Sequence, residues 1–306
     1  GINAGDSYTT GIRNTAIGYN ALTSDTTGSD NIGVGAYASD NITTGSNNTG
    51  IGVSAVTAVT TANDNTGVGY HALLANTTGA SNTAVGKDAL VAHTTGNSNS
   101  AFGKDSLKSN TTAAFNTALG KSAMADNTTG SNNTAVGTNA LSDNTTANDN
   151  TAIGYKALRL NTTGAENVGV GASALGANTT ASQNTAIGYQ ALKANTTAGS
   201  NTAVGNSSMY TNTTGANNTA IGRNALYANT TADNNTAVGY QALNAATTGH
   251  SNVAVGKEAL LANTTGADNV SVGTEALESN TTASWNVAVG RKALQLNTTG
   301  DKSVAI

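Results

Sequence analysis

The chain of 306 residues contains no cysteine and no proline, and only 10% of its residues are charged and 4% aromatic. Without cysteine, neither disulfides nor thiolate metal sites can support the fold. The formal net charge of −4 provides no basic field, so we expect no nucleic-acid partner. The sequence also lacks a run of about eighteen apolar residues, so we predict no direct membrane insertion of this segment.

The dominant feature is a repeat of 17 residues that recurs eighteen times without insertion, N-T-A-[IV]-G-x-x-A-L-x-x-N-T-T-[GA]-x-x. We number its positions as columns 1 to 17. Column 1 is Asn from Asn14 to Asn286, and only Ser303 departs from it. The array opens at column 5 and closes at column 4, so we expect residues 1–306 to be one solenoid array cut from a longer chain.

Each repeat has the signals of a short strand followed by turns. Columns 2 to 4, as in Thr219-Ala220-Ile221, are rich in β-branched residues and predict the strand. Columns 8 and 9, mostly Ala-Leu, predict either a second short strand or one helical turn. The invariant glycine of column 5 indicates positive φ or a close backbone approach, as at Gly154, Gly171, Gly188, Gly205, Gly222 and Gly239.

A single repeat buries too few aliphatic side chains to fold alone, so the repeats must stack. We therefore predict an all-β fold, a parallel β-solenoid or β-roll of eighteen 17-residue coils. Identical columns then become ladders, in which stacked asparagine amides donate to one another. The predicted ladder of column 1 includes Asn150, Asn167, Asn184, Asn201, Asn218 and Asn235.

The strand offers a candidate self-association face. If columns 2 and 4 face the core, column 3 points outward and is always Ala, Gly or Ser, which predicts close packing of chains in a homotrimer or bundle. The predicted face contains Ala152, Gly169, Ala186, Ala203, Ala220 and Ala237. Two alternatives stay open: column 3 is small because it lies in a narrow core, or a β-branched stripe lies outside.

The motifs N-T-A-I-G and N-V-A-V-G resemble the head repeats of trimeric autotransporter adhesins. The whole unit is also similar to N-T-A-I-G-Y-x-A-L-x-x-N-T-T-G arrays of phage tail fibres and bacterial surface proteins. This resemblance implies left-handed parallel β-rolls that trimerise. It further implies a structural fibre, filament or adhesin stalk at a cell surface, outside the cell or on a virion, with a host surface or glycans as further partners.

Candidate residues for chemistry are few, and we expect no enzyme, cofactor or metal site. His71, His93 and His250 fall in different columns and so do not stack into a metal site. Two further functions stay open: ice binding by the threonine pairs of columns 13 and 14, and carbohydrate binding by the column-6 tyrosines. The tyrosines are Tyr19, Tyr70, Tyr155, Tyr189 and Tyr240. Column 12 also fits the N-glycosylation pattern, with Asn110, Asn161, Asn178 and Asn195 as candidate acceptors.

The first coils depart most from the repeat. Ser39 and Val56 replace the leucine of column 9, and Ile42 and Val59 replace the asparagine of column 12. We therefore expect this end of the array either to pack differently or to face another partner.

Overall fold

The computed structural model describes all 306 residues, and its regular structure consists entirely of eighteen short strands. It contains no helix, and hence none long and apolar enough to cross a membrane. The chain forms two compact units, Gly1–Asn150 and Thr151–Ile306, each a parallel β-solenoid with 17 residues per turn. The predicted all-β solenoid is therefore confirmed.

The strands occupy columns 2 to 4 of each coil, as the β-branched residues predicted. Unit 1 contains β1 (Thr15–Ile17), β2 (Ile32–Val34), β3 (Thr49–Ile51), β4 (Thr66–Val68), β5 (Thr83–Val85), β6 (Ser100–Phe102), β7 (Thr117–Leu119) and β8 (Thr134–Val136). Unit 2 contains β9 (Thr151–Ile153), β10 (Val168–Val170), β11 (Thr185–Ile187), β12 (Thr202–Val204), β13 (Thr219–Ile221), β14 (Thr236–Val238), β15 (Val253–Val255), β16 (Val270–Val272), β17 (Val287–Val289) and β18 (Val304–Ala305).

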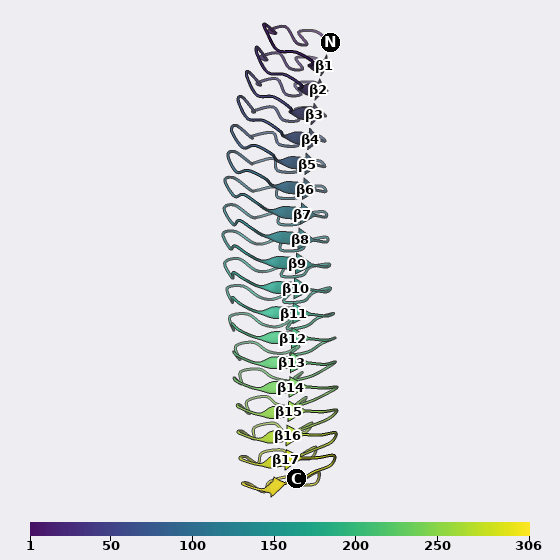
Figure 1. Ribbon diagram of the computed structural model, residues 1–306, viewed down its shortest axis with the longest axis vertical. Helices are drawn as coiled ribbons and strands as arrows, with labels where there is room; N and C mark the ends of the chain where they lie inside the picture. Colours follow the sequence, from purple (N-terminus) through teal and green to yellow (C-terminus); the bar gives the residue numbers. More distant parts are fainter. The chain divides into compact units, whose positions relative to one another are not determined.

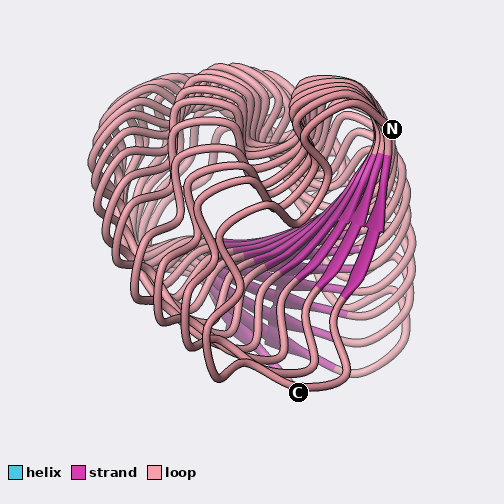
Figure 2. Ribbon diagram, turned by 90° about the horizontal axis from the view of Figure 1, so that it is seen from above, coloured by secondary structure: helices cyan, strands magenta, loops and turns pink.

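Within each unit, every strand pairs in parallel with the strand of the next coil (Figure 1). The register places like columns over each other: Thr202 pairs with Thr219 and Val204 with Ile221. Seen from above, the strands gather on one side of the coils and loops form the remainder (Figure 2). Stacked side chains in one column are thus about 4.8 Å apart.

The second apolar segment is neither a strand nor a helical turn, so both predicted alternatives are wrong. Columns 7 and 9 instead adopt left-handed backbone conformations, as at Asn224 (φ 55°) and Leu226 (φ 50°). Such conformations cost an L-residue about 1–2 kcal/mol. The turns persist because their N–H groups bond to neighbouring coils, for example Leu226 to the carbonyl of Ala242 at 2.9 Å. Column 7 often carries Asn or Asp, which tolerate this conformation, whereas the leucine of column 9 gives no sign of it in the sequence.

The glycine of column 5 ends each strand and allows a close approach between coils. Gly205 has φ 133°, and a Cβ atom built on it would lie 2.6 Å from the carbonyl oxygen of Gly222. The other column-5 glycines singled out from the sequence have φ between 130° and 138° (Gly154, Gly171, Gly188, Gly222 and Gly239). Both reasons for glycine therefore hold at this position.

The core of each coil is narrow and mixes aliphatic with amide side chains. Alanines of columns 3 and 8 surround the leucine of column 9, as Ala220, Ala225 and Leu226 do in one coil. Asparagines of columns 1 and 12 close the coil at 0–1% exposure in all but the terminal coils. Because these amides are buried, each must find hydrogen-bond partners inside the solenoid.

The first coils replace part of this polar core with aliphatic side chains. Ile42 and Val59 occupy column 12 and are fully buried, next to the smaller column-9 residues Ser39 and Val56. The exchange keeps aliphatic volume inside the coil but interrupts the amide ladder. The buried hydroxyl of Ser39 has no hydrogen-bond partner, which marks this end as less well satisfied.

Candidate interaction surface

The side chains of column 3 point into the core, which corrects the predicted self-association face. Ala152, Ala186, Ala203, Ala220 and Ala237 are all 0% exposed, and Gly169 is also buried. The physical reason is lack of space: a Cβ atom on Gly169 would lie 3.2 Å from Cγ of Leu158. These residues are small because the core is narrow, and they cannot contact a second chain.

Columns 2 and 4 point outward instead and form an exposed stripe, which we call the strand face. Its side chains are threonine, valine and isoleucine except for Ser100, Phe102 and Leu119. The most exposed include Ile17, Ile51, Leu119, Ile153, Ile187 and Ile221. In Ile187 and Ile221 the side chains are 40% and 42% exposed. No residue of either column carries a charge in any coil. An exposed apolar stripe of this length is typical of an interaction site.

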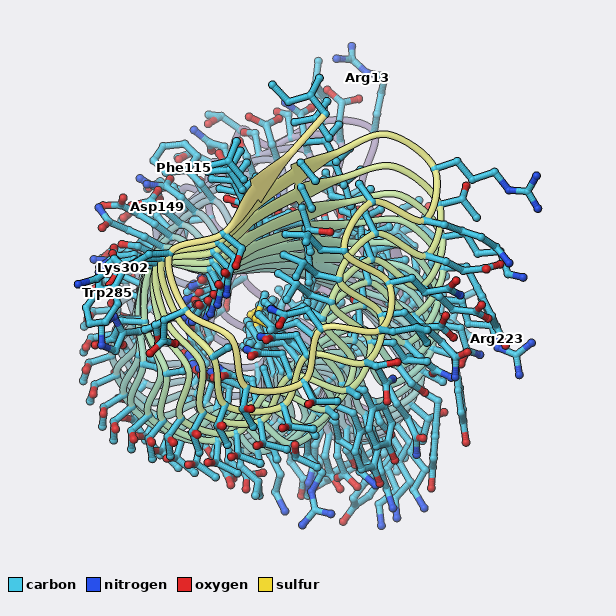
Figure 3. The ribbon with its side chains drawn as sticks, turned by 90° about the horizontal axis from the view of Figure 1, so that it is seen from below. Arg13, Phe115, Asp149, Arg223, Trp285 and Lys302 are labelled. Carbon is cyan, nitrogen blue, oxygen red and sulfur yellow. The ribbon has the colours of Figure 1, made fainter.

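The two edges of the strand face differ in charge. Column 6 includes Lys87, Lys104, Lys121, Arg223, Lys257 and Arg291 and no acidic residue. Column 17, on the other edge, includes Asp30, Asp64, Asp149, Glu166 and Asp268, with Arg13 and Lys302 as its only cations. Figure 3 shows Arg223 on one side of the strands of unit 2, and Trp285 and Lys302 on the other. The basic edge is partly neutralised, since Lys87, Lys104 and Lys257 pair with carboxylates of column 7.

The asparagines of column 1 form a ladder inside each unit. Within unit 2, Oδ1 of Asn201 accepts the backbone N–H of Asn218 at 2.9 Å and its Nδ2 at 3.3 Å. The same backbone-to-amide contact joins Asn167 to Asn184, Asn184 to Asn201, and Asn218 to Asn235. In unit 1 it joins Asn133 to Asn150. The predicted amide-to-amide contacts are present, but between these rungs the backbone N–H makes the shorter bond, and Nδ2 also donates to a carbonyl, as Asn218 does to Ala232 at 2.8 Å.

Column 12 forms a second amide ladder, which corrects the predicted glycosylation sites. Asn110, Asn161, Asn178 and Asn195 are each 0% exposed. Their Nδ2 atoms, which a glycan would have to modify, are already donors: Asn195 to Oδ1 of Asn178 at 3.0 Å and to the carbonyl of Ala198 at 2.9 Å. The folded chain therefore offers none of these amides to a glycosylating enzyme. The repetition of this column, like that of column 1, was the signal for a ladder.

Beyond the first coils, two residues replace the asparagine of the second ladder, with different results. Ala246 stands where the repeat has asparagine, and Oδ1 of the preceding Asn229 is buried without a hydrogen-bond partner. His93 replaces another asparagine and keeps the ladder connected: its Nδ1 lies 2.9 Å from Nδ2 of Asn110, and its Nε2 lies 2.7 Å from the carbonyl of Gly96. Since the amide and the carbonyl are fixed as donor and acceptor, His93 must be neutral with its proton on Nε2.

The two threonines of each pair have different surroundings. Column-13 hydroxyls bond to the backbone of the next coil, as Thr213 Oγ1 does to the carbonyl of Thr230 at 2.9 Å, while column-14 threonines such as Thr214 are exposed. The pairs thus do not share one water-facing surface. The column-6 tyrosines are 40–53% exposed, yet smaller residues such as Ala172, between Tyr155 and Tyr189, interrupt the column.

The metal-ligating side chains do not gather into a site. No group of three or more His, Cys, Asp or Glu side chains is placed to hold a metal ion. His71 lies 3.4 Å from Asp88, and His93 and His250 lie in other coils, the first buried and the second exposed. What the arrangement provides is repeated hydrogen bonding within each unit and an outward apolar stripe.

Comparison with known proteins adds no identification. No family model matches the chain, and no curated protein is similar to it. Its function must therefore be argued from the strand face and the ladders.

Completing the second ladder should stabilise unit 2. In the variant Ala246→Asn, the new amide would donate to the unpaired Oδ1 of Asn229 and accept from Asn263. We therefore expect the free energy of unfolding to increase by about 1 kcal/mol. Chemical denaturation followed by circular dichroism measures the change. As a matched control, Asn212→Ala removes one rung and should destabilise the chain. An unchanged or lower midpoint for Ala246→Asn would contradict the ladder as described.

His93 should make stability depend on pH. Burial lowers the pKa of His93 below its ordinary value of 6.5, so at mildly acidic pH the unfolded chain binds a proton that the folded chain does not. Stability is thus retained above about pH 6.5 and decreases as pH falls below it. His93→Asn should weaken this dependence, whereas His250→Asn, at an exposed position, should leave it intact. Equal slopes between pH 7.5 and 5 in both variants, by denaturant titration, would show the assignment to be wrong.

Proposed function

We propose that the chain is a non-enzymatic structural segment of an extracellular fibre, filament or adhesin stalk. The observation that carries this proposal is the strand face, an uncharged stripe of threonine and β-branched side chains over β1–β8 and again over β9–β18. Regular coils with amide ladders give a stiff scaffold, and the exposed stripe gives copies a means to associate. The partner is a second copy of this chain, in a homotrimer or a bundle.

The strand face suits a second copy because it is the same in every coil. Two such stripes can pack with threonine and aliphatic side chains in contact and bury no charge, which avoids the large desolvation penalty of buried ions. Removing the stripe from water contributes about 25 cal/mol per Å² of apolar area. A repeated stripe therefore gains affinity with each coil that takes part.

The charge of the two edges indicates how the copies are oriented. If two copies face each other with parallel axes, related by rotation about that axis, the basic edge of one meets the acidic edge of the other. If the copies run antiparallel, like edges meet. Opposite charges across an interface favour association, and like charges disfavour it. We therefore propose that the copies in the homotrimer or bundle are parallel, with like coils at the same level.

Placing charge on the strand face should abolish association without unfolding the chain. We expect Ile187→Glu combined with Ile221→Glu to yield monomers in sedimentation, because both side chains are outward and each charge would have to be buried in the assembly. The matched control is Thr180→Glu with Thr214→Glu, two exposed residues of column 14 at the same spacing. Association of both variants to the same degree, or a monomeric parent chain at all concentrations, would rule out the strand face as the interface.

The orientation is measured in the same assembly. Because the chain has no cysteine, Val287→Cys introduces a single thiol near the C-terminal end of the strand face of unit 2, at the outward first residue of β17. Parallel copies place this thiol beside its own counterpart, so oxidation should give disulfide-linked dimers. Antiparallel copies would separate the two thiols, and no such dimer would form.

A further inference from the structure

A hollow in unit 2 interrupts the otherwise regular surface of the coils. Its volume is about 330 Å³, at the small end of the range for ligand pockets, and it lies on columns 7, 10 and 11 rather than on the strand face. The floor is formed by Ser173, Gly176 and Ala177 of a single coil. The hollow exists because Gly176 has no side chain in column 10, where the coils on either side carry Arg159 and Lys193.

The walls of the hollow are cationic. Lys156 and Arg159 line it from the preceding coil and Lys193 from the following coil, while Leu160 supplies an apolar side. No carboxylate lines it. Three of the 13 lysines and arginines of an acidic chain therefore meet around one hollow.

The two lysines are held by neutral groups. Lys193 Nζ donates to the hydroxyl of Tyr210 at 3.1 Å and lies 5.1 Å from the centre of that ring. Lys156 Nζ lies 4.9 Å from the ring centre of Tyr155. Aromatic partners position an ammonium group but do not cancel its charge, unlike the carboxylates that pair with Lys87, Lys104 and Lys257. Both lysines can thus still attract an anion.

We propose that this hollow is a binding site for an oxyanion of the phosphate or sulfate type, either free or as the ester group of a small molecule such as a sugar. The lysines and Arg159 would donate charge-assisted hydrogen bonds to the anion oxygens. A volume of about 330 Å³ accommodates a group larger than the bare ion, with Leu160 beside its less polar part. This site is independent of the strand face and adds ligand binding to a scaffold.

The test uses the full chain with inorganic phosphate, glucose 6-phosphate and glucose as probes, followed by titration calorimetry. We expect saturable binding of phosphate or of the sugar phosphate and none of glucose. Tighter binding of the sugar phosphate would identify an ester as the natural form, and tighter binding of phosphate the free ion. Glucose binding as tightly as its phosphate would overturn the proposal.

Two variants test separately how the lysine charges and the open volume of the hollow contribute to binding. Lys156→Ala with Lys193→Ala removes two cations, and Gly176→Tyr fills the hollow with a residue that column 10 already carries at Tyr210 and Tyr227. Each should weaken binding about tenfold or more. Lys257→Ala, a lysine outside the hollow, should leave it unchanged. If Gly176→Tyr fails to fold by circular dichroism, the lysine variant decides alone. Unchanged binding in a folded variant, or no saturable binding by the parent chain, would overturn the site.

Discussion

The structure depends on one constraint: each residue stacks on the same column of the next coil, about 4.8 Å away. A column therefore accepts only residues that tolerate a copy of themselves at that distance. Asparagine meets this condition because its amide both donates and accepts, as between Asn201 and Asn218. Glycine in column 5 meets it by allowing backbone contact, and the strand columns meet it by being uncharged, since stacked like charges would repel.

The narrow core determines which side chains of the strand are exposed. Since only a small side chain fits beside the buried leucine, column 3 faces inward and the larger β-branched side chains must face out. The apolar stripe is thus a consequence of how the coil packs. Coils differ from one another in their chemistry only where a residue departs from the repeat. Ala246 leaves an amide unpaired, His93 introduces a titratable group, and Gly176 opens a hollow.

Much of this architecture could be predicted from the sequence, because a fixed period of 17 residues defines coil, strand position and ladder columns together. Which face of the strand points into the core could not be predicted. Period-two alternation says which residues share a face but not which face is inside. The left-handed conformation of the column-9 leucines, such as Leu226, also had no signal, because contacts between coils impose it against local preference. The buried amides of column 12 resembled glycosylation sites, although their repetition already indicated a ladder. The cationic hollow depends on residues from three coils and could be found only once they were stacked.

One repeat makes one turn of the solenoid, with like residues in register, and distances between repeats test this most directly. Because the chain has no cysteine, spin labels can be attached to pairs of cysteines introduced at the exposed column-14 threonines of unit 2. Electron–electron distance measurements on the pairs 197 and 265, 197 and 282, and 180 and 282 span four, five and six repeats. Stacked coils should give distances of about 19, 24 and 29 Å, a constant increment of about 4.8 Å per repeat. Distances that do not increase by this constant step with each added repeat would contradict the stacked solenoid.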